Sequence, residues 1–148
     1  MKRFFCLTLA LCILAACACA EPGSVFSVAE FERCAKPFFD EKVKFAFSEE
    51  EYNVYMASAC AIVVPEKDEV IPYIKVSALK NYLFVAYSLA AVRYFMQDDD
   101  LFSYNASLFM DAYLSLLSSG KQRSRITPQG YTISVWEKDG VYFFGIER

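Results

Sequence analysis

Residues 131–147 read YTISVWEKDGVYFFGIE, and this stretch decides the fold class that the sequence predicts. Apolar and polar residues alternate along it, which is the side-chain period of a half-buried β-strand. Asp139-Gly140 is typical of a two-residue hairpin turn, which would set Val135 opposite Phe144 and Ile133 opposite Ile146. Because an isolated hairpin is only marginally stable in water, its apolar face must pack against the rest of the chain.

The residues before the hairpin favour helices, at about 28–119. Two capping-box patterns, Ser27 with Glu30 and Ser48 with Glu51, predict helix starts. Apolar residues then recur every three or four positions, with breaks at the prolines and at Gly120. The expected helices cover about 28–47, interrupted at Pro37, then 49–65, 73–96 and 98–119; a polar loop is expected at 121–130.

The predicted fold is therefore mainly α (α+β), with four or five helices and a C-terminal two-stranded β-hairpin packed on them. A chain of 148 residues has the size of one domain. We place this single globular domain at 21–148, with the hairpin at about 131–147.

The first 20 residues differ in kind from the rest. Lys2 and Arg3 precede an uncharged apolar run of about 13 residues at 4–16, followed by small residues. The run is too short for a stable membrane span, which needs roughly 20 residues. Residues 1–20 therefore have the pattern of a secretory signal peptide, and we expect the protein to be exported.

Two overlapping processing sites lie at the end of this signal. Leu14-Ala15-Ala16-Cys17 resembles the lipobox of bacterial lipoproteins, in which the cysteine is lipidated and becomes the new N-terminus. The resemblance implies cleavage before Cys17, acyl chains on its thiol and an anchor in the outer membrane. Ala18-Cys19-Ala20 equally fits ordinary signal peptidase cleavage after Ala20, which would leave the protein soluble in the periplasm, or secreted.

Cleavage after Ala20 would leave two cysteines, Cys34 and Cys60. Both lie on expected inward helix faces, and an oxidising compartment favours disulfides, so the sequence predicts that they are bonded. Separate buried thiols remain the alternative.

The chain contains no histidine, and this limits its chemistry. Ser-His-Asp and Cys-His triads, His-bound zinc and imidazole acid-base catalysis are all excluded. The acidic run Asp98-Asp99-Asp100 stands at an expected helix start, where capping and the helix dipole explain it without a metal ion. We therefore expect no catalytic residue, no cofactor and no metal site.

Partner-binding residues are expected near the hairpin. Lys121, Arg123 and Arg125 form the basic cluster of the expected mature chain, and Trp136 lies on the hairpin face opposite Val135. Aromatic residues make up 17% of the chain, and tyrosines are common at protein interfaces. Since acidic residues (18) outnumber Lys and Arg (15), nucleic acid is not an expected partner.

These observations predict an exported, non-catalytic envelope protein that binds another exported protein, such as an accessory lipoprotein or an inhibitor or immunity-type binder. A lipid on Cys17 would add contact with the membrane. Two alternatives stay open at this point: a carrier of an apolar small ligand within a helical domain, and a carboxylate-dependent enzyme.

Overall fold

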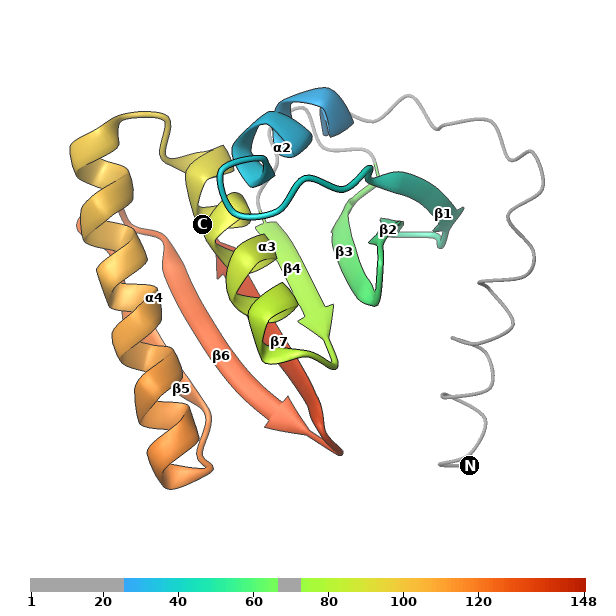
Figure 1. Cartoon of the computed structure of the whole chain (residues 1–148). Coiled ribbons are helices and arrows are strands. Elements are labelled where there is room, and N and C mark those ends of the chain that lie inside the picture. The colour runs from blue at the N-terminus through green and yellow to red at the C-terminus, as the bar shows by residue number, and fades with distance from the viewer. Residues whose placement is uncertain (1–25, 67–72) are drawn as a thin grey trace.

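The computed structural model describes residues 26–66 and 73–148, which form one antiparallel sheet with three helices (Figure 1). The seven strands lie in the order β1-β2-β3-β4-β7-β6-β5. In chain order the elements are α2 (Val28–Ala35), β1 (Lys44–Ser48), β2 (Tyr52–Ala57), β3 (Cys60–Pro65), β4 (Tyr73–Ala78), α3 (Asn81–Phe95), α4 (Asp99–Ser119), β5 (Arg123–Ile126), β6 (Thr132–Lys138) and β7 (Val141–Glu147).

This architecture overturns the expectation of a mainly helical protein with a C-terminal two-stranded hairpin. The hairpin exists, but it is part of a seven-stranded sheet. Residues 49–65, expected to be a helix, form the β2–β3 hairpin, in which Ala57 pairs with Cys60 across a two-residue turn. Ser58 in that turn has φ 51°, a left-handed conformation that allows the tight reversal.

The mistaken helix has a physical cause. β2 and β3 are largely buried on both faces, so they carry nearly continuous apolar residues instead of a clear alternation. Such a run matches both the helical and the extended period. The supposed capping residue Ser48 instead donates a hydrogen bond to Asn53 Oδ1 (2.6 Å) across the β1–β2 pair.

Residues 73–96, expected to be one long helix, divide into a strand and a helix. β4 ends at Ala78, and α3 begins at Asn81 after Lys80, whose side chain makes no capping hydrogen bond. The polar loop expected at 121–130 contains the edge strand β5. The sequence pattern did not separate β4 from α3 because no capping side chain marks the start of α3. It missed β5 because that strand has four residues.

Four local predictions are confirmed. Ser27 caps α2 by accepting a hydrogen bond from the Glu30 N–H. Asp98 caps α4 by accepting hydrogen bonds from the N–H groups of Asp100 and Leu101 (both 3.0 Å), and Gly120 ends α4 with φ 64°. β6 and β7 pair in the predicted register, with Val135 opposite Phe144 and Ile133 opposite Ile146.

The helices form a layer on one side of the sheet. α3 packs on the central strands β3, β4 and β7, α4 packs on β5 and β6, and α2 packs beside α3 (Figure 1). The core between the layers is aromatic: Phe109 of α4 meets Phe144 of β7 edge-on, with ring centroids 5.3 Å apart. Each such fully buried side chain contributes about 1.5–3 kcal/mol to stability.

Even α4, the longest described helix with 21 residues, lacks the continuous apolar length that a membrane span requires.

A candidate binding cleft between the helices

The structure does not bring the predicted partner-binding residues together. Arg125 lies on β5 and binds Asp111 of α4, with its Nε and Nη2 atoms 3.0 and 2.6 Å from Asp111 Oδ2. Arg123 donates to Ser119 Oγ at the end of α4 (3.0 Å). These two arginines therefore attach α4 to the edge of the sheet. Lys121 is exposed in the connection from α4 to β5.

Trp136 lies on the other face of the sheet. Its neighbour Val135 is fully buried and faces the helices, so Trp136 points away from them. The indole is stacked on the ring of Phe143, with centroids 5.3 Å apart and planes 6° apart. Trp136 therefore belongs to a separate surface from the arginines. Cys17, the predicted lipidation site, lies outside the described residues.

The expected disulfide is absent, because Cys34 and Cys60 are both free and buried. Cys60, the first residue of β3, pairs with Ala78 at the end of β4, close to where α3 begins. Cys34 lies near Arg93, in the last turn of α3. The two thiols are thus at different ends of α3, and the prediction failed because it placed Cys60 on a helix.

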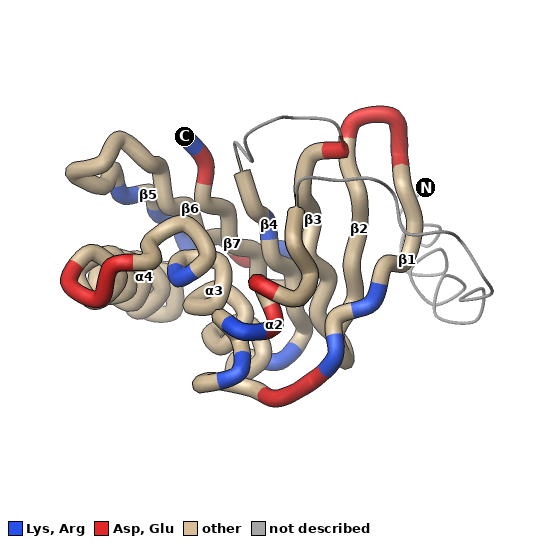
Figure 2. The backbone as a smooth tube through the Cα atoms, turned by 90° about the horizontal axis from the view of Figure 1, so that it is seen from above, with Lys and Arg blue, Asp and Glu red and all other residues tan. Residues whose placement is uncertain are grey.

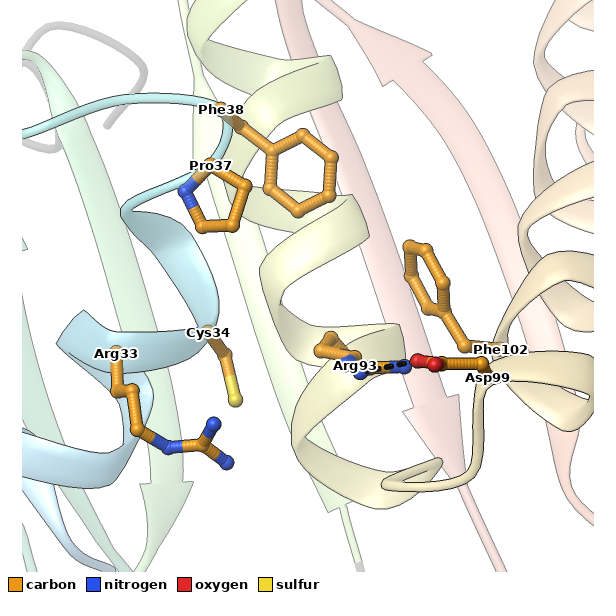
Figure 3. A pocket seen from close by; sticks show the side chains of 7 residues that line it. All are labelled: Arg33, Cys34, Pro37, Phe38, Arg93, Asp99 and Phe102. Carbon is orange, nitrogen blue, oxygen red and sulfur yellow. Dashed lines mark hydrogen bonds and ion pairs between the residues drawn. The ribbon is translucent and has the colours of Figure 1, made fainter.

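A cleft opens between α2, the start of α4 and the last turns of α3 (Figure 3). Its volume is about 330 Å³, within the range of sites for small ligands or single side chains. We call it the α2–α4 cleft. It is lined by Arg33, Cys34, Pro37, Phe38, Arg93, Asp99 and Phe102.

Arg93 lies on one side of this cleft, where Asp99 and Phe102 hold its guanidinium. Its Nη2 atom is 2.6 Å from Asp99 Oδ1, and its guanidinium lies over the ring of Phe102, 5.0 Å from the centroid. Its Nη1 atom is buried and has no hydrogen-bond partner. A buried N–H donor without an acceptor carries an uncompensated desolvation cost of about 1–3 kcal/mol. Arg93 therefore carries a buried donor that lacks an acceptor among the described residues.

Arg33 lies on the opposite side of the cleft, on α2. Its Nε and Nη2 atoms bind the two oxygens of Glu30 at 2.9 and 2.6 Å, and Nη2 also donates to Gln97 Oε1 (3.0 Å). The hydrogen bonds to Glu30, together with the charge of that carboxylate, raise the pKa of Arg33 above its already high value. The Arg33 side chain is 61% exposed, so its remaining donors are open to solvent.

The thiol of Cys34 lies between the two arginines (Figure 3). Burial raises the pKa of this thiol, and the nearby Glu30 carboxylate raises it further, whereas Arg33 and Arg93 only partly oppose the shift. Cys34 is therefore a protonated thiol at neutral pH. It is a poor nucleophile and a poor metal ligand.

The aromatic side chains give the cleft an apolar wall. Phe38, from the loop after α2, and Phe102, from α4, have ring centroids 6.2 Å apart. The cleft thus combines guanidinium donors with apolar rings. This combination suits a carboxylate group attached to an apolar body.

A second groove lies on the outer side of α2, where Glu32 pairs with Lys42 (Nζ–Oε2 2.9 Å). Charges of both signs alternate along it, as the neighbouring blue and red segments near α2 show in Figure 2. This groove has no apolar wall and no unpartnered buried donor among the described residues that line it. It is therefore the weaker candidate for a site.

Sequence reasoning missed the α2–α4 cleft. Its lining comes from three elements, and α2 and α4 are separated by more than 60 residues. One signal was visible: Arg93 is the single charged residue in a helix of 15 residues, and an acidic run begins shortly after that helix, at Asp98. An isolated arginine in an apolar helix needs a carboxylate partner, and that pairing places the start of α4 next to the end of α3.

Within residues 26–66 and 73–148, no group of three or more Cys, Asp or Glu side chains is arranged to hold a metal ion. No protein-family model, curated protein or solved structure shows significant similarity to this chain. The function therefore has to be argued from the geometry of the chain itself.

Proposed function

We propose that this chain is a non-catalytic binding protein whose α2–α4 cleft receives a carboxylate-bearing segment of another protein. The observation that carries the proposal is the Nη1 atom of Arg93, a buried donor without an acceptor beside an open cleft. Because the Nη1 atom is covered in this structure, a carboxylate in the cleft would satisfy it through a charge-assisted hydrogen bond once the guanidinium turns toward the cleft.

The cleft favours a side chain of a partner protein over a free apolar ligand. A carrier would be expected to enclose its ligand in an apolar cavity, whereas this cleft is open and has two arginines on its walls. A protein segment can place its acidic group between the arginines and its apolar atoms against Phe38 and Phe102. The rest of the partner would then lie over α2 and the start of α4.

Catalysis is a weaker explanation for the cleft. Carboxylate-dependent hydrolysis needs two carboxyl groups with different roles, and Asp99 is the one carboxyl group among the described residues that line the cleft. That group is ion-paired with Arg93. The Cys34 thiol, whose pKa is raised, does not supply a nucleophile.

The export signal defines where such a partner would be found. An exported protein binds other exported or envelope proteins, either in solution or from a lipid anchor on Cys17. Replacing Cys17 with Ser is expected to release the protein from the membrane fraction if Cys17 is lipidated. Unchanged fractionation would contradict lipidation and favour cleavage after Ala20.

The proposal is tested by comparing Arg93→Gln with Arg125→Gln in a pull-down from envelope extract. The two arginines are well matched, because each pairs with an aspartate at 2.6 Å and their side chains are 25% and 34% exposed. We expect Arg93→Gln to reduce recovery of the bound partner at least tenfold and Arg125→Gln to leave it unchanged. Equal recovery with both variants would contradict binding in the cleft.

A further inference from the structure

The outward face of α4 is unusual for the outermost helix of a protein. Surface helices normally carry charged residues on their solvent side. After Asp100, α4 has one charged residue, Asp111, and that residue is neutralised by Arg125. In Figure 2 the acidic run colours the start of α4, and most of the helix after it is tan.

Large apolar side chains are exposed on this face. Leu114 is 58% exposed and Leu117 is 48% exposed, and Met110 is half-buried one turn earlier. The N-terminal half of the same face carries small residues instead, Ser103 and Ser107, both exposed. These five positions follow each other at spacings of four, three, four and three, so they form one continuous stripe along the helix.

We propose that this stripe, which we call the α4 stripe (Ser103, Ser107, Met110, Leu114 and Leu117), is a homodimer interface. Two copies of α4 would pack antiparallel about a two-fold axis at Met110. This axis sets Leu117 against Ser103 of the second copy and Leu114 against Ser107. On both sides of the central Met110 pair a large side chain therefore meets a small one, which allows close approach of the two helices.

The charges at the ends of α4 are complementary in the same arrangement. Asp100 lies in the first turn of α4 and Lys121 follows the helix, and neither forms an ion pair within the part of the chain that the structure describes. The two-fold axis at Met110 brings Asp100 of one copy beside Lys121 of the other, at both ends of the interface. A parallel arrangement would instead place the acidic ends together.

A membrane surface fits the α4 stripe less well. Helices that lie on membranes usually carry Lys and Arg on their polar face, whereas every charged residue of α4 is acidic. Anionic lipids would repel Asp100, which forms no ion pair within the described residues. A second copy, which supplies Lys121, offers the opposite charge.

The expected dimer is reversible. A helix of 21 residues is about 30 Å long, and a single pair of such helices makes a small interface compared with the roughly 800 Å² per partner of a standard complex. The mass of the purified mature protein should therefore rise from that of a monomer to that of a dimer as the concentration increases. A monomer at every accessible concentration would overturn the proposal.

The specificity of the interface is tested with a matched pair of variants. Leu79 and Leu114 are both 58% exposed, and Leu79 lies outside α4, between β4 and α3. In sedimentation equilibrium, Leu114→Glu should raise the dimer dissociation constant at least tenfold, and Leu79→Glu should leave it unchanged. An equal effect of the two variants would overturn the proposal.

The orientation of the helices is tested by exchanging charges. Asp100→Lys alone should weaken the dimer at least threefold, because it sets two positive charges side by side at both ends. The double variant Asp100→Lys with Lys121→Asp should restore wild-type association. If the double variant associates no better than the single one, the antiparallel arrangement is wrong. Neither substitution touches a buried residue, so both variants should keep the fold.

Discussion

Individual side chains in this protein are positioned by short charged contacts at the edges of an apolar core. Glu32 of α2 is an example: its Oε2 accepts from Lys42 Nζ (2.9 Å) and its Oε1 accepts from the Val43 N–H (2.8 Å). Burial alone would raise the pKa of Glu32, but these two hydrogen bonds and the charge of Lys42 lower it below the ordinary value of 4.5. The ionised carboxylate therefore stabilises the folded loop after α2.

Replacing Glu32 with Gln should make this contribution visible. Because the folded pKa of Glu32 is lowered, its stabilisation is present above pH 4.5 and is lost as the pH falls toward the folded value. Urea unfolding at pH 7 should show a loss of about 1 kcal/mol for Glu32→Gln. The difference between the variant and the wild type should shrink as the pH falls through the folded pKa of Glu32. The exposed Glu50, replaced by Gln, is the control and should show neither effect.

The hairpin of β6 and β7 shows how backbone conformation determines an element. Its turn contains Asp139 with φ 55° and Gly140 with φ 80°, two successive left-handed residues of the kind that a type I′ turn requires. Asp tolerates this region, whereas most other residues with a Cβ atom are strained there. The turn is therefore the most sequence-dependent point of the hairpin.

Gly140→Ala should lower the free energy of unfolding by about 1 kcal/mol, because Ala is strained at positive φ. Gly145, in β7, is the matched control. Its φ is not in the left-handed region, and an added Cβ atom would lie 3.9 Å from Lys75 and Trp136, an ordinary contact distance. Gly145→Ala should leave stability unchanged or increase it slightly. A larger loss at Gly145 than at Gly140, measured by denaturant unfolding, would contradict this account of the turn.

The sequence predicted those elements whose local signals agree with each other. α4 has a capping aspartate, a helical repeat and a terminal glycine, and the β6–β7 hairpin has alternation and an Asp-Gly turn. Strands β2 and β3 carry conflicting signals, since their buried apolar runs fit a helix and Ser48 with Glu51 imitates a capping box. The α2–α4 cleft could not be predicted, because it depends on tertiary packing of α2 against the end of α3.

At the scale of the molecule, the sheet consists of two meanders that meet at their last strands. The strands β1 to β4 form one, β5 to β7 form the other, and β4 pairs antiparallel with β7 in the middle. All described helices cover the same face, and α2 and α4 approach each other over α3 (Figure 1). The cleft lies where α2 and α4 come close together. Its walls are therefore formed by the helix that precedes the first meander and by the helices that connect the two meanders.

The free thiols give a test of the whole fold. Cys34 and Cys60 are both free, so no disulfide links the helices and strands of the described residues. In denaturant without reductant, both residues should react completely with iodoacetamide, as measured by mass spectrometry of their peptides. The melting temperature of the native protein should be the same with and without reductant. A recovered peptide pair linked through Cys34 and Cys60 would contradict the arrangement of α2 and β3.

The central claim, that the α2–α4 cleft binds a carboxylate through Arg93, is tested most directly by an NMR titration with N-acetylphenylalanine. This probe carries a carboxylate and an aromatic ring, and its neutral amide differs only in charge. We expect the carboxylate form to shift the backbone amide signals of Cys34, Arg93 and Phe102, and the amide form to bind at least fivefold more weakly. Equal shifts with both compounds, or shifts confined to residues outside the cleft, would contradict the claim.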